Sequence, residues 1–180
     1  MLNKEQQKKL LKIARQTLEA YIKEGKIPQF GEKDPELLKP YGAFVTLRKG
    51  KELRGCIGHI IGSKPLYELI RDMAIASSTQ DPRFPPVTEE ELKSIKIEIS
   101  VLSEPKLTKG HKEIELGKHG VIVQSGFNQG VYLPQVATET GWKKEQFLSS
   151  LCLHKAGLPA DAWKNKDTNL YIFEAEVFEE

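Results

Sequence analysis

The fold is decided by residues 41–60, which read YGAFVTLRKGKELRGCIGHI. The run Tyr41–Lys49 is apolar and rich enough in β-branched and aromatic residues to form a strand. Lys49-Gly50 stands where a tight turn would reverse that strand. Residues 51–60 are therefore expected to return alongside it, so that this stretch forms a β-hairpin.

The second half of the hairpin carries the densest chemistry in the chain. Side chains alternate between the two faces of a strand. Leu53 and Ile57 are therefore expected on a buried face, with Arg54 and Cys56 together on the other. A nearby cation favours the thiolate form of cysteine, which is the reactive form. This spacing predicts a reactive or ligand-contacting Cys56.

The neighbours of Cys56 allow two interpretations. His59 is out of phase with Cys56 on a straight strand, although Gly58 gives the backbone freedom to turn. Alternatively, Cys56 is a small buried hydrophobic residue. In that interpretation Gly55 and Gly58 mark a bulge or the close packing of another backbone.

Composition describes an ordinary globular protein. The chain has 180 residues, of which 39% are hydrophobic and 29% charged, and its formal net charge is +2. That charge is too small to argue for nucleic acid by itself. The two cysteines are far apart and make no disulfide framework. Neither a signal peptide nor a membrane-spanning run is recognisable, so we expect a cytoplasmic protein with no membrane association.

The remaining elements predict an α+β fold of mainly antiparallel sheets packed with amphipathic helices. Asn3 and Gln6 form a capping box for a helix that Gly25 ends. Ser63 is expected to cap a second helix that ends at residues 77–79. Strands are expected at 95–101, 121–123, 131–133 and 171–177, and a further helix between residues 142 and 157.

The segment Asp81-Pro82-Arg83-Phe84-Pro85-Pro86 is stiff, because its prolines fix φ. A stiff loop can hold Arg83 and Phe84 in defined positions, which favours a role in ligand binding. The alternative is that Phe84 fills the core and Arg83 caps backbone carbonyls.

Metal ligation is not favoured by the cysteine and histidine spacings. Cys56 and His59 diverge on a strand, and Cys152 and His154 diverge on a helix. His119, between glycines at a strand entrance, is a better candidate as a partner for Cys56 across space. No Rossmann or P-loop pattern is present, and no cofactor is expected.

The chain resembles the AMMECR-type domain family, also called AmmeMemoRadiSam system protein A. Leu53-Arg54-Gly55-Cys56-Ile57-Gly58 is the most specific motif, and the resemblance covers nearly the whole chain. The supporting motifs are Asp81-Pro82-Arg83-Phe84-Pro85-Pro86-Val87, Ile99-Ser100-Val101-Leu102-Ser103, Gly117, His119-Gly120-Val121, Leu133-Pro134-Gln135-Val136-Ala137, Gly141-Trp142 and Lys155-Ala156-Gly157-Leu158. The chain departs from the family pattern at His59, where small hydroxyl residues are common, and at Lys143, where a helix-capping acid is usual.

The resemblance implies a single AMMECR-type unit over residues 2–180, built from two unequal α/β subdomains whose boundary is unknown. It also implies a cleft to which the Arg-Gly-Cys motif contributes. Prokaryotic members are associated with Memo-like and radical-SAM proteins, and a link to nucleic acid or translation has been proposed for the family. No settled reaction accompanies the resemblance.

Three functions remain open from the sequence. The first is a cysteine-dependent enzyme or enzyme subunit, with Cys56 assisted by Arg54 and with His59 or His119 carrying protons. The second is a non-catalytic module that binds a small anion, a nucleotide or RNA through Arg54, Arg83, Phe84 and the backbone amides at Gly55 and Gly58. The third is an interaction subunit working with Memo-like and radical-SAM proteins. The rigid glycine and proline segments favour a shaped ligand site.

Overall fold

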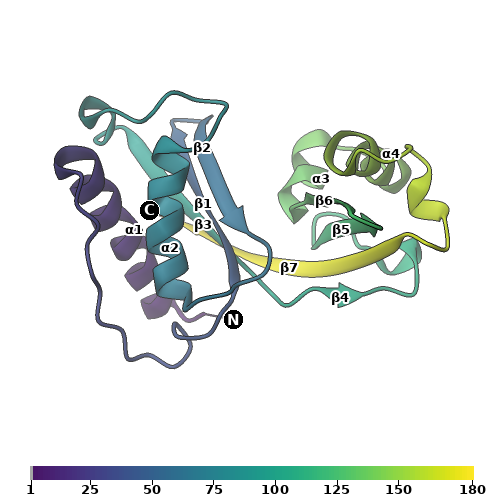
Figure 1. The fold of residues 1–180 in the computed structure, drawn as a ribbon, viewed down its shortest axis with the longest axis horizontal. Helices are drawn as coiled ribbons and strands as arrows, with labels where there is room; N and C mark the ends of the chain where they lie inside the picture. The colour runs from purple at the N-terminus through teal and green to yellow at the C-terminus, as the bar shows by residue number, and fades with distance from the viewer. Residues whose placement is uncertain (1) are drawn as a thin grey trace. The chain divides into compact units, whose positions relative to one another are not determined.

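The computed structural model describes residues 2–180, which form two compact units of unequal size (Figure 1). The first unit comprises residues 2–102 and Glu176–Glu180, and the second comprises Ser103–Ala175. Both units combine helices with antiparallel strands. The predicted α+β class is therefore confirmed.

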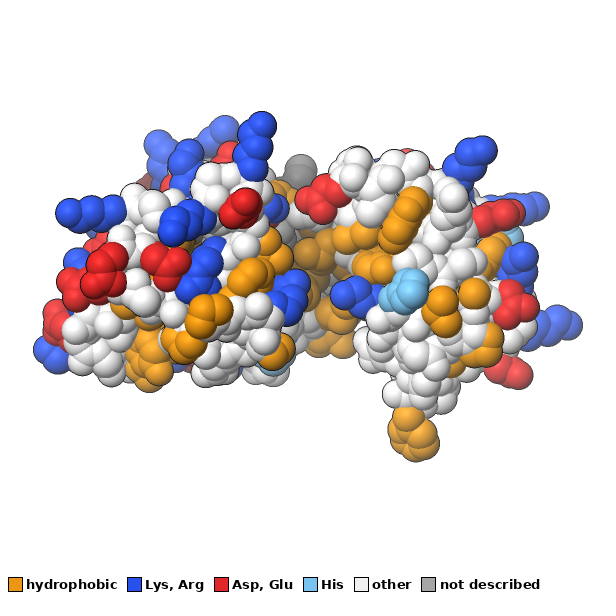
Figure 2. Space-filling model, turned by 90° about the horizontal axis from the view of Figure 1, so that it is seen from above, with side chains coloured by type: hydrophobic (Ala, Val, Ile, Leu, Met, Phe, Trp, Pro, Cys, Tyr) orange, Lys and Arg blue, Asp and Glu red, His pale blue; other side chains and the backbone are white. Residues whose placement is uncertain are grey.

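The surface is mixed in charge. On the face shown in Figure 2, basic, acidic and hydrophobic side chains are interspersed. Within residues 2–180, no helix is both long enough and apolar enough to cross a membrane.

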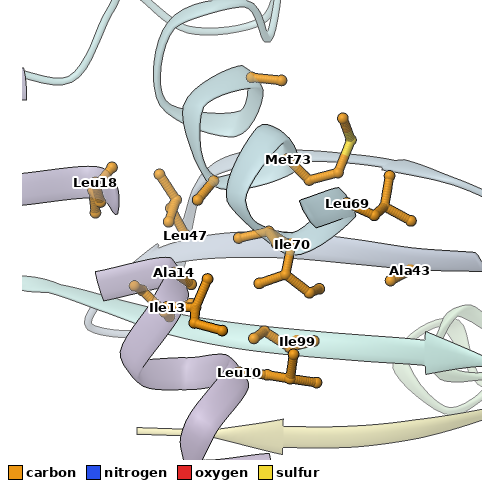
Figure 3. Packing of buried hydrophobic residues seen from close by; sticks show 14 of the residues in the cluster. Leu10, Ile13, Ala14, Leu18, Ala43, Leu47, Leu69, Ile70, Met73 and Ile99 are labelled. Carbon is orange, nitrogen blue, oxygen red and sulfur yellow. The ribbon is translucent and has the colours of Figure 1, made fainter. Parts of the chain in front are cut away.

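The first unit is built on the predicted hairpin. Strand β1 (Gly42–Lys49) pairs antiparallel with β2 (Glu52–His59) on one side and with β3 (Ile95–Leu102) on the other. Helices α1 (Lys4–Glu24) and α2 (Leu66–Thr79) cover one face of this sheet. Figure 3 shows side chains from both helices and the sheet pointing toward one another in the core.

The predicted helix ends explain where these helices begin and stop. Asn3 caps α1 and completes the capping box with Gln6, while Gly25 adopts a left-handed conformation (φ 65°) that ends the helix. The prediction for α2 is wrong in one detail. Pro65 occupies the N-cap position instead of Ser63, and no side chain caps this end.

A short 3₁₀ turn, η1 (Glu89–Glu91), follows the proline-rich segment and precedes β3. Thr88 stands at its N-cap, and the Thr88 N–H donates to the Glu91 carboxylate at 3.1 Å. Thr88 and Glu91 therefore form a capping box, and it places Glu91 near the loop that contains Arg83.

The second unit is organised around β5 (His119–Ser125), which pairs antiparallel with β6 (Asn128–Tyr132) and with β7 (Asn169–Glu179). The short strand β4 (Lys106–Leu107) also pairs with β7. Its helical elements are η2 (His111–Glu113), α3 (Pro134–Thr140), α4 (Lys144–Ser150), the π-helical turn η3 (Leu151–Ala156) and η4 (Ala162–Lys164). Cys152 is fully buried in this core beside Leu148 and Leu151.

Candidate functional site

Arg54 lies in a β-bulge. Leu47 pairs with Gly55 and Arg48 pairs with Leu53, so Arg54 has no partner in the β1–β2 register. A bulge interrupts the alternation of side chains on a strand. Leu53 is half-buried instead of buried, and Ile57 is half-buried while packing on the core.

The two glycines of the motif are required for packing. A Cβ added to Gly55 would lie 2.0 Å from the backbone oxygen of Ser77 in α2. At Gly58 it would lie 2.3 Å from the ring of Phe44. These approaches explain both glycines without a ligand, in agreement with the alternative that they mark close packing.

The Arg54 guanidinium braces the proline-rich loop. Its Nε and Nη2 each donate to the Glu91 carboxylate at 2.9 Å, and its Nη1 and Nη2 donate to the carbonyls of Pro85 and Pro86 at 3.0 and 3.3 Å. The Arg54 and Glu91 side chains are only 13% and 18% exposed. The hydrogen bonds from Arg54 lower the pKa of Glu91 to about 2. Arg54 therefore has a structural role in this arrangement.

Asp81 and Arg83 cover the backbone of Cys56 at the edge of the sheet, where β2 lies. The Cys56 N–H donates to Asp81 Oδ2 at 2.8 Å, and the Cys56 carbonyl accepts from Arg83 Nη2 at 3.3 Å. Arg83 also binds Asp81 through Nε at 2.9 Å and Nη2 at 2.7 Å. Hydrogen bonds from Arg83 hold the pKa of the buried Asp81 carboxyl well below its usual range.

Phe84 lies close to both arginines. Its ring centroid is 6.0 Å from the guanidinium carbon of Arg54 and 5.6 Å from that of Arg83, within cation–π range. The proline-rich loop therefore lies close to Arg54, through the Pro85 and Pro86 carbonyls and the Phe84 ring. Phe84 is half-buried and is not part of the central core cluster.

The Cys56 thiol has different neighbours from Arg54. The Thr46 hydroxyl donates to its Sγ at 3.2 Å. Burial raises the pKa of Cys56; the Thr46 hydrogen bond and the Arg83 charge oppose this rise, while Asp81 and Glu98 add to it. The expectation that Arg54 shares a face with Cys56 and activates it is therefore wrong, because the bulge directs the guanidinium to Glu91. The cation that acts on the thiol is Arg83.

The two histidines considered as proton carriers, His59 and His119, belong to different units. His59 is exposed at the end of β2 and pairs with Ala43, three residues from Cys56 and hence out of phase with it. His119 is buried in the second unit, where its Nδ1 accepts a hydrogen bond from the Glu115 N–H at 3.1 Å. A partnership between His119 and Cys56 stays a prediction.

Three contributors to this cluster were not identified as such from the sequence. From the sequence, Asp81 is expected only as part of a stiff loop and Thr46 only as part of a strand, and Glu91 belongs to no predicted site. Their partners lie between 10 and 37 residues away, so no local pattern connects them. Within residues 2–180, no group of three His, Cys, Asp or Glu side chains is arranged to hold a metal ion.

Comparisons with known proteins agree with the resemblance found in the sequence. The family model described as AMMECR1 matches residues 11–178. A protein of Methanopyrus kandleri is 46% identical, with 95% of this chain and 86% of that protein aligned. A protein of Methanosarcina mazei is 42% identical, with 100% and 94% aligned. The crystal structure of an uncharacterised protein from Pyrococcus horikoshii matches with a TM-score of 0.87 and 44% identity, covering 95% of this chain and 89% of that one.

Proposed function

Since the chain belongs to the AMMECR1 family, we propose that its first unit is a binding module that recognises a small anionic ligand through Arg83. The Pyrococcus horikoshii relative is itself described as uncharacterised, so its name adds no activity. The proposal is therefore based on the geometry of the cluster around Cys56.

The observation that carries the proposal is a rigid guanidinium on the surface. The Arg83 side chain is 55% exposed, yet it is fixed by a carboxylate that is only 2% exposed. Within residues 2–180, no hydrogen bond is made by its Nη1. A fixed arginine fork suits a carboxylate or phosphate, because little side-chain entropy is lost when the ligand binds.

The neighbouring groups support recognition of an anion with an apolar part. Phe84 supplies a half-buried ring beside the guanidinium, and Pro85 and Pro86 keep the loop stiff. Arg54 is already committed to Glu91 and to two carbonyls, so we assign it to holding the loop. Arg83 is also paired with Asp81, so the pair presents little net charge to a ligand. We therefore expect a selective site of modest affinity.

Cysteine-dependent catalysis is the competing proposal, with Cys56 as nucleophile and His59 or His119 as proton carrier. It has less support, because burial raises the pKa of Cys56 and so disfavours the thiolate. No hydrogen bond within residues 2–180 joins Sγ to a histidine that could act as its general base. A partnership with Memo-like and radical-SAM proteins is compatible with either proposal and would be tested by co-purification.

Native mass spectrometry of the protein purified from its own cells would test the binding module. We expect a small anionic ligand to be retained, and Arg83→Lys to weaken its binding roughly tenfold by removing the fork while keeping the charge. Arg71→Lys is the matched control, because Arg71 pairs with Asp72 in the same unit at 2.8 Å. Equal ligand retention by both variants would contradict the proposal.

A further inference from the structure

The second unit contains a cavity of about 370 Å³ that shares no residue with the cluster around Cys56. It is bordered by the segment from the end of β4 to η2, by η4 and the segment after it, and by the start of β7. β4 and β7 run side by side here (Figure 1). The volume lies within the usual range of small-molecule sites, roughly 300–1,000 Å³.

The charge of the lining is one-sided. Lys109, Lys164 and Lys166 line the cavity together with His111, and no Asp or Glu of the described chain lines it. None of these three lysines forms an ion pair within residues 2–180. Glu113 belongs to an adjoining cavity that shares Lys109 and His111, and its carboxylate accepts from the Lys109 backbone N–H at 3.2 Å.

Neutral donors and a tryptophan complete the lining. Asn165 and Asn169 are exposed in it, and their amides can donate to an oxygen-rich ligand. The Trp163 ring is contacted by the Lys164 ammonium at 4.9 Å and by the His111 ring at 5.0 Å between centroids. Lys164 and His111 therefore lie beside a buried aromatic ring whose fluorescence can report on the cavity.

The backbone holds the walls of the cavity in place before any ligand binds. The Thr108 N–H donates to the Leu170 carbonyl at 2.9 Å, which joins the first wall to the third. The Thr168 N–H donates to the Asn165 carbonyl at 3.1 Å, which closes the second wall. Fixed walls reduce the entropy lost on binding.

We propose that this cavity binds a small phosphate-bearing molecule. Three ammonium groups exceed what one carboxylate needs, whereas a phosphate group carries up to two charges and three strong acceptor oxygens. The three lysines line one cavity. On the face shown in Figure 2, basic and acidic side chains are interspersed, and that face carries no continuous basic strip of the kind that a nucleic acid backbone requires.

Fluorescence of Trp163 provides the test, because the chain has only one other tryptophan, Trp142. In the full-length Trp142→Phe protein, we expect pyrophosphate to change Trp163 emission saturably and to bind more tightly than inorganic phosphate. Raising the salt concentration should weaken binding. The triple variant Lys109→Gln/Lys164→Gln/Lys166→Gln should lose affinity at least roughly tenfold. Lys118→Gln, which removes a lysine of the same unit that does not line the cavity, is the control and should bind like the parent.

Three results would overturn the proposal. The first is the absence of saturable pyrophosphate binding by calorimetry as well as fluorescence. The second is an equal affinity in the triple variant and in Lys118→Gln. The third is tighter binding of a single-stranded oligoribonucleotide than of pyrophosphate, because it would make the lysines part of a nucleic acid surface. Arg83→Lys should leave pyrophosphate binding unchanged, which separates this site from the one proposed in the first unit.

Discussion

Cys56 illustrates how one residue's environment sets its reactivity. Its thiol is half-buried, accepts a hydrogen bond from Thr46 and has a raised pKa. We expect slow alkylation at neutral pH and a labelling rate that rises only above the ordinary thiol range of about 8.5. Labelling of each cysteine against pH, read by mass spectrometry, would measure this rate, with the fully buried Cys152 as an internal reference.

Two arginine variants distinguish whether Arg83 or Arg54 acts on the pKa of Cys56. Arg83→Ala should raise the pKa of Cys56 further, because the Arg83 charge lowers it while Asp81 raises it. Arg54→Ala should change the pKa much less, because Arg54 is bound to Glu91. Fast labelling at neutral pH that is lost in Arg54→Ala would instead restore the activated cysteine inferred from the sequence.

At the scale of elements, the Arg54–Glu91 pair joins the bulged strand β2 to the turn before β3. Glu91→Gln should lower the free energy of unfolding by about 2 kcal/mol at neutral pH, because one partner of a partly buried, two-point pair is lost. Chemical denaturation would measure the change. Glu89→Gln, an exposed substitution in the same turn, is the control and should have little effect.

The pH dependence of this pair follows from the lowered pKa of Glu91. The carboxylate is favoured in the folded state, so its contribution is fully present above the usual pKa of 4.5. It is lost as the pH falls through the folded-state value of about 2. The free energies of unfolding of the parent and of Glu91→Gln should therefore converge as the pH falls from 4.5 to about 2. A difference that persists unchanged below pH 2 would contradict the assignment.

The packing of β2 on α2 predicts the effect of enlarging Gly55. A methyl group there would meet a backbone oxygen of Ser77, which cannot move aside as a side chain can. We expect Gly55→Ala to lower the free energy of unfolding by about 3 kcal/mol. Gly31→Ala, where no atom lies within 4 Å of the added Cβ, is the matched control for thermal unfolding. Similar melting temperatures for the two variants would disprove the packing role.

Most elements were predictable because their signals are local. Asn3, Gln6 and Gly25 define α1, and the turn at Gly50 defines the hairpin. The bulge at Arg54 was not predictable from the sequence. The alternation of side chains is followed along one strand, whereas a bulge depends on how that strand pairs with its neighbouring strand. The lysine-lined cavity was also missed, since its walls come from segments about 50 residues apart without a shared period.

At the scale of the whole molecule, the second unit is an insertion within the first. Ser103 and Glu174, near its two ends, are joined by hydrogen bonds of 2.9 Å in both directions. The chain then returns through Glu176–Glu180 to the first unit. There Glu176 accepts from the Leu2 N–H and from Gln7, while Glu180 accepts from Arg15 and from the Ile97 N–H.

Removing residues 176–180 should therefore weaken the first unit selectively. We expect faster hydrogen exchange at the start of α1 and in β3, because these segments lose their partners, and little change in β5 and β6. Hydrogen exchange read by mass spectrometry would locate the effect, with Glu179→Gln as a control that retains those partners. Equal acceleration in both units would contradict a local role for the C-terminal residues.

This return of the chain has a consequence for biosynthesis. During translation, domains usually complete in order from the N-terminus. Here the helices and three strands of the first unit leave the ribosome early, but Glu176 and Glu180 emerge after all of the second unit. The unit that is started first is thus completed last. Until residues 176–180 are released, the nascent chain lacks the Glu180 carboxylate that accepts from Arg15 and from the Ile97 N–H. Docking of this segment is then the last step in folding the N-terminal half.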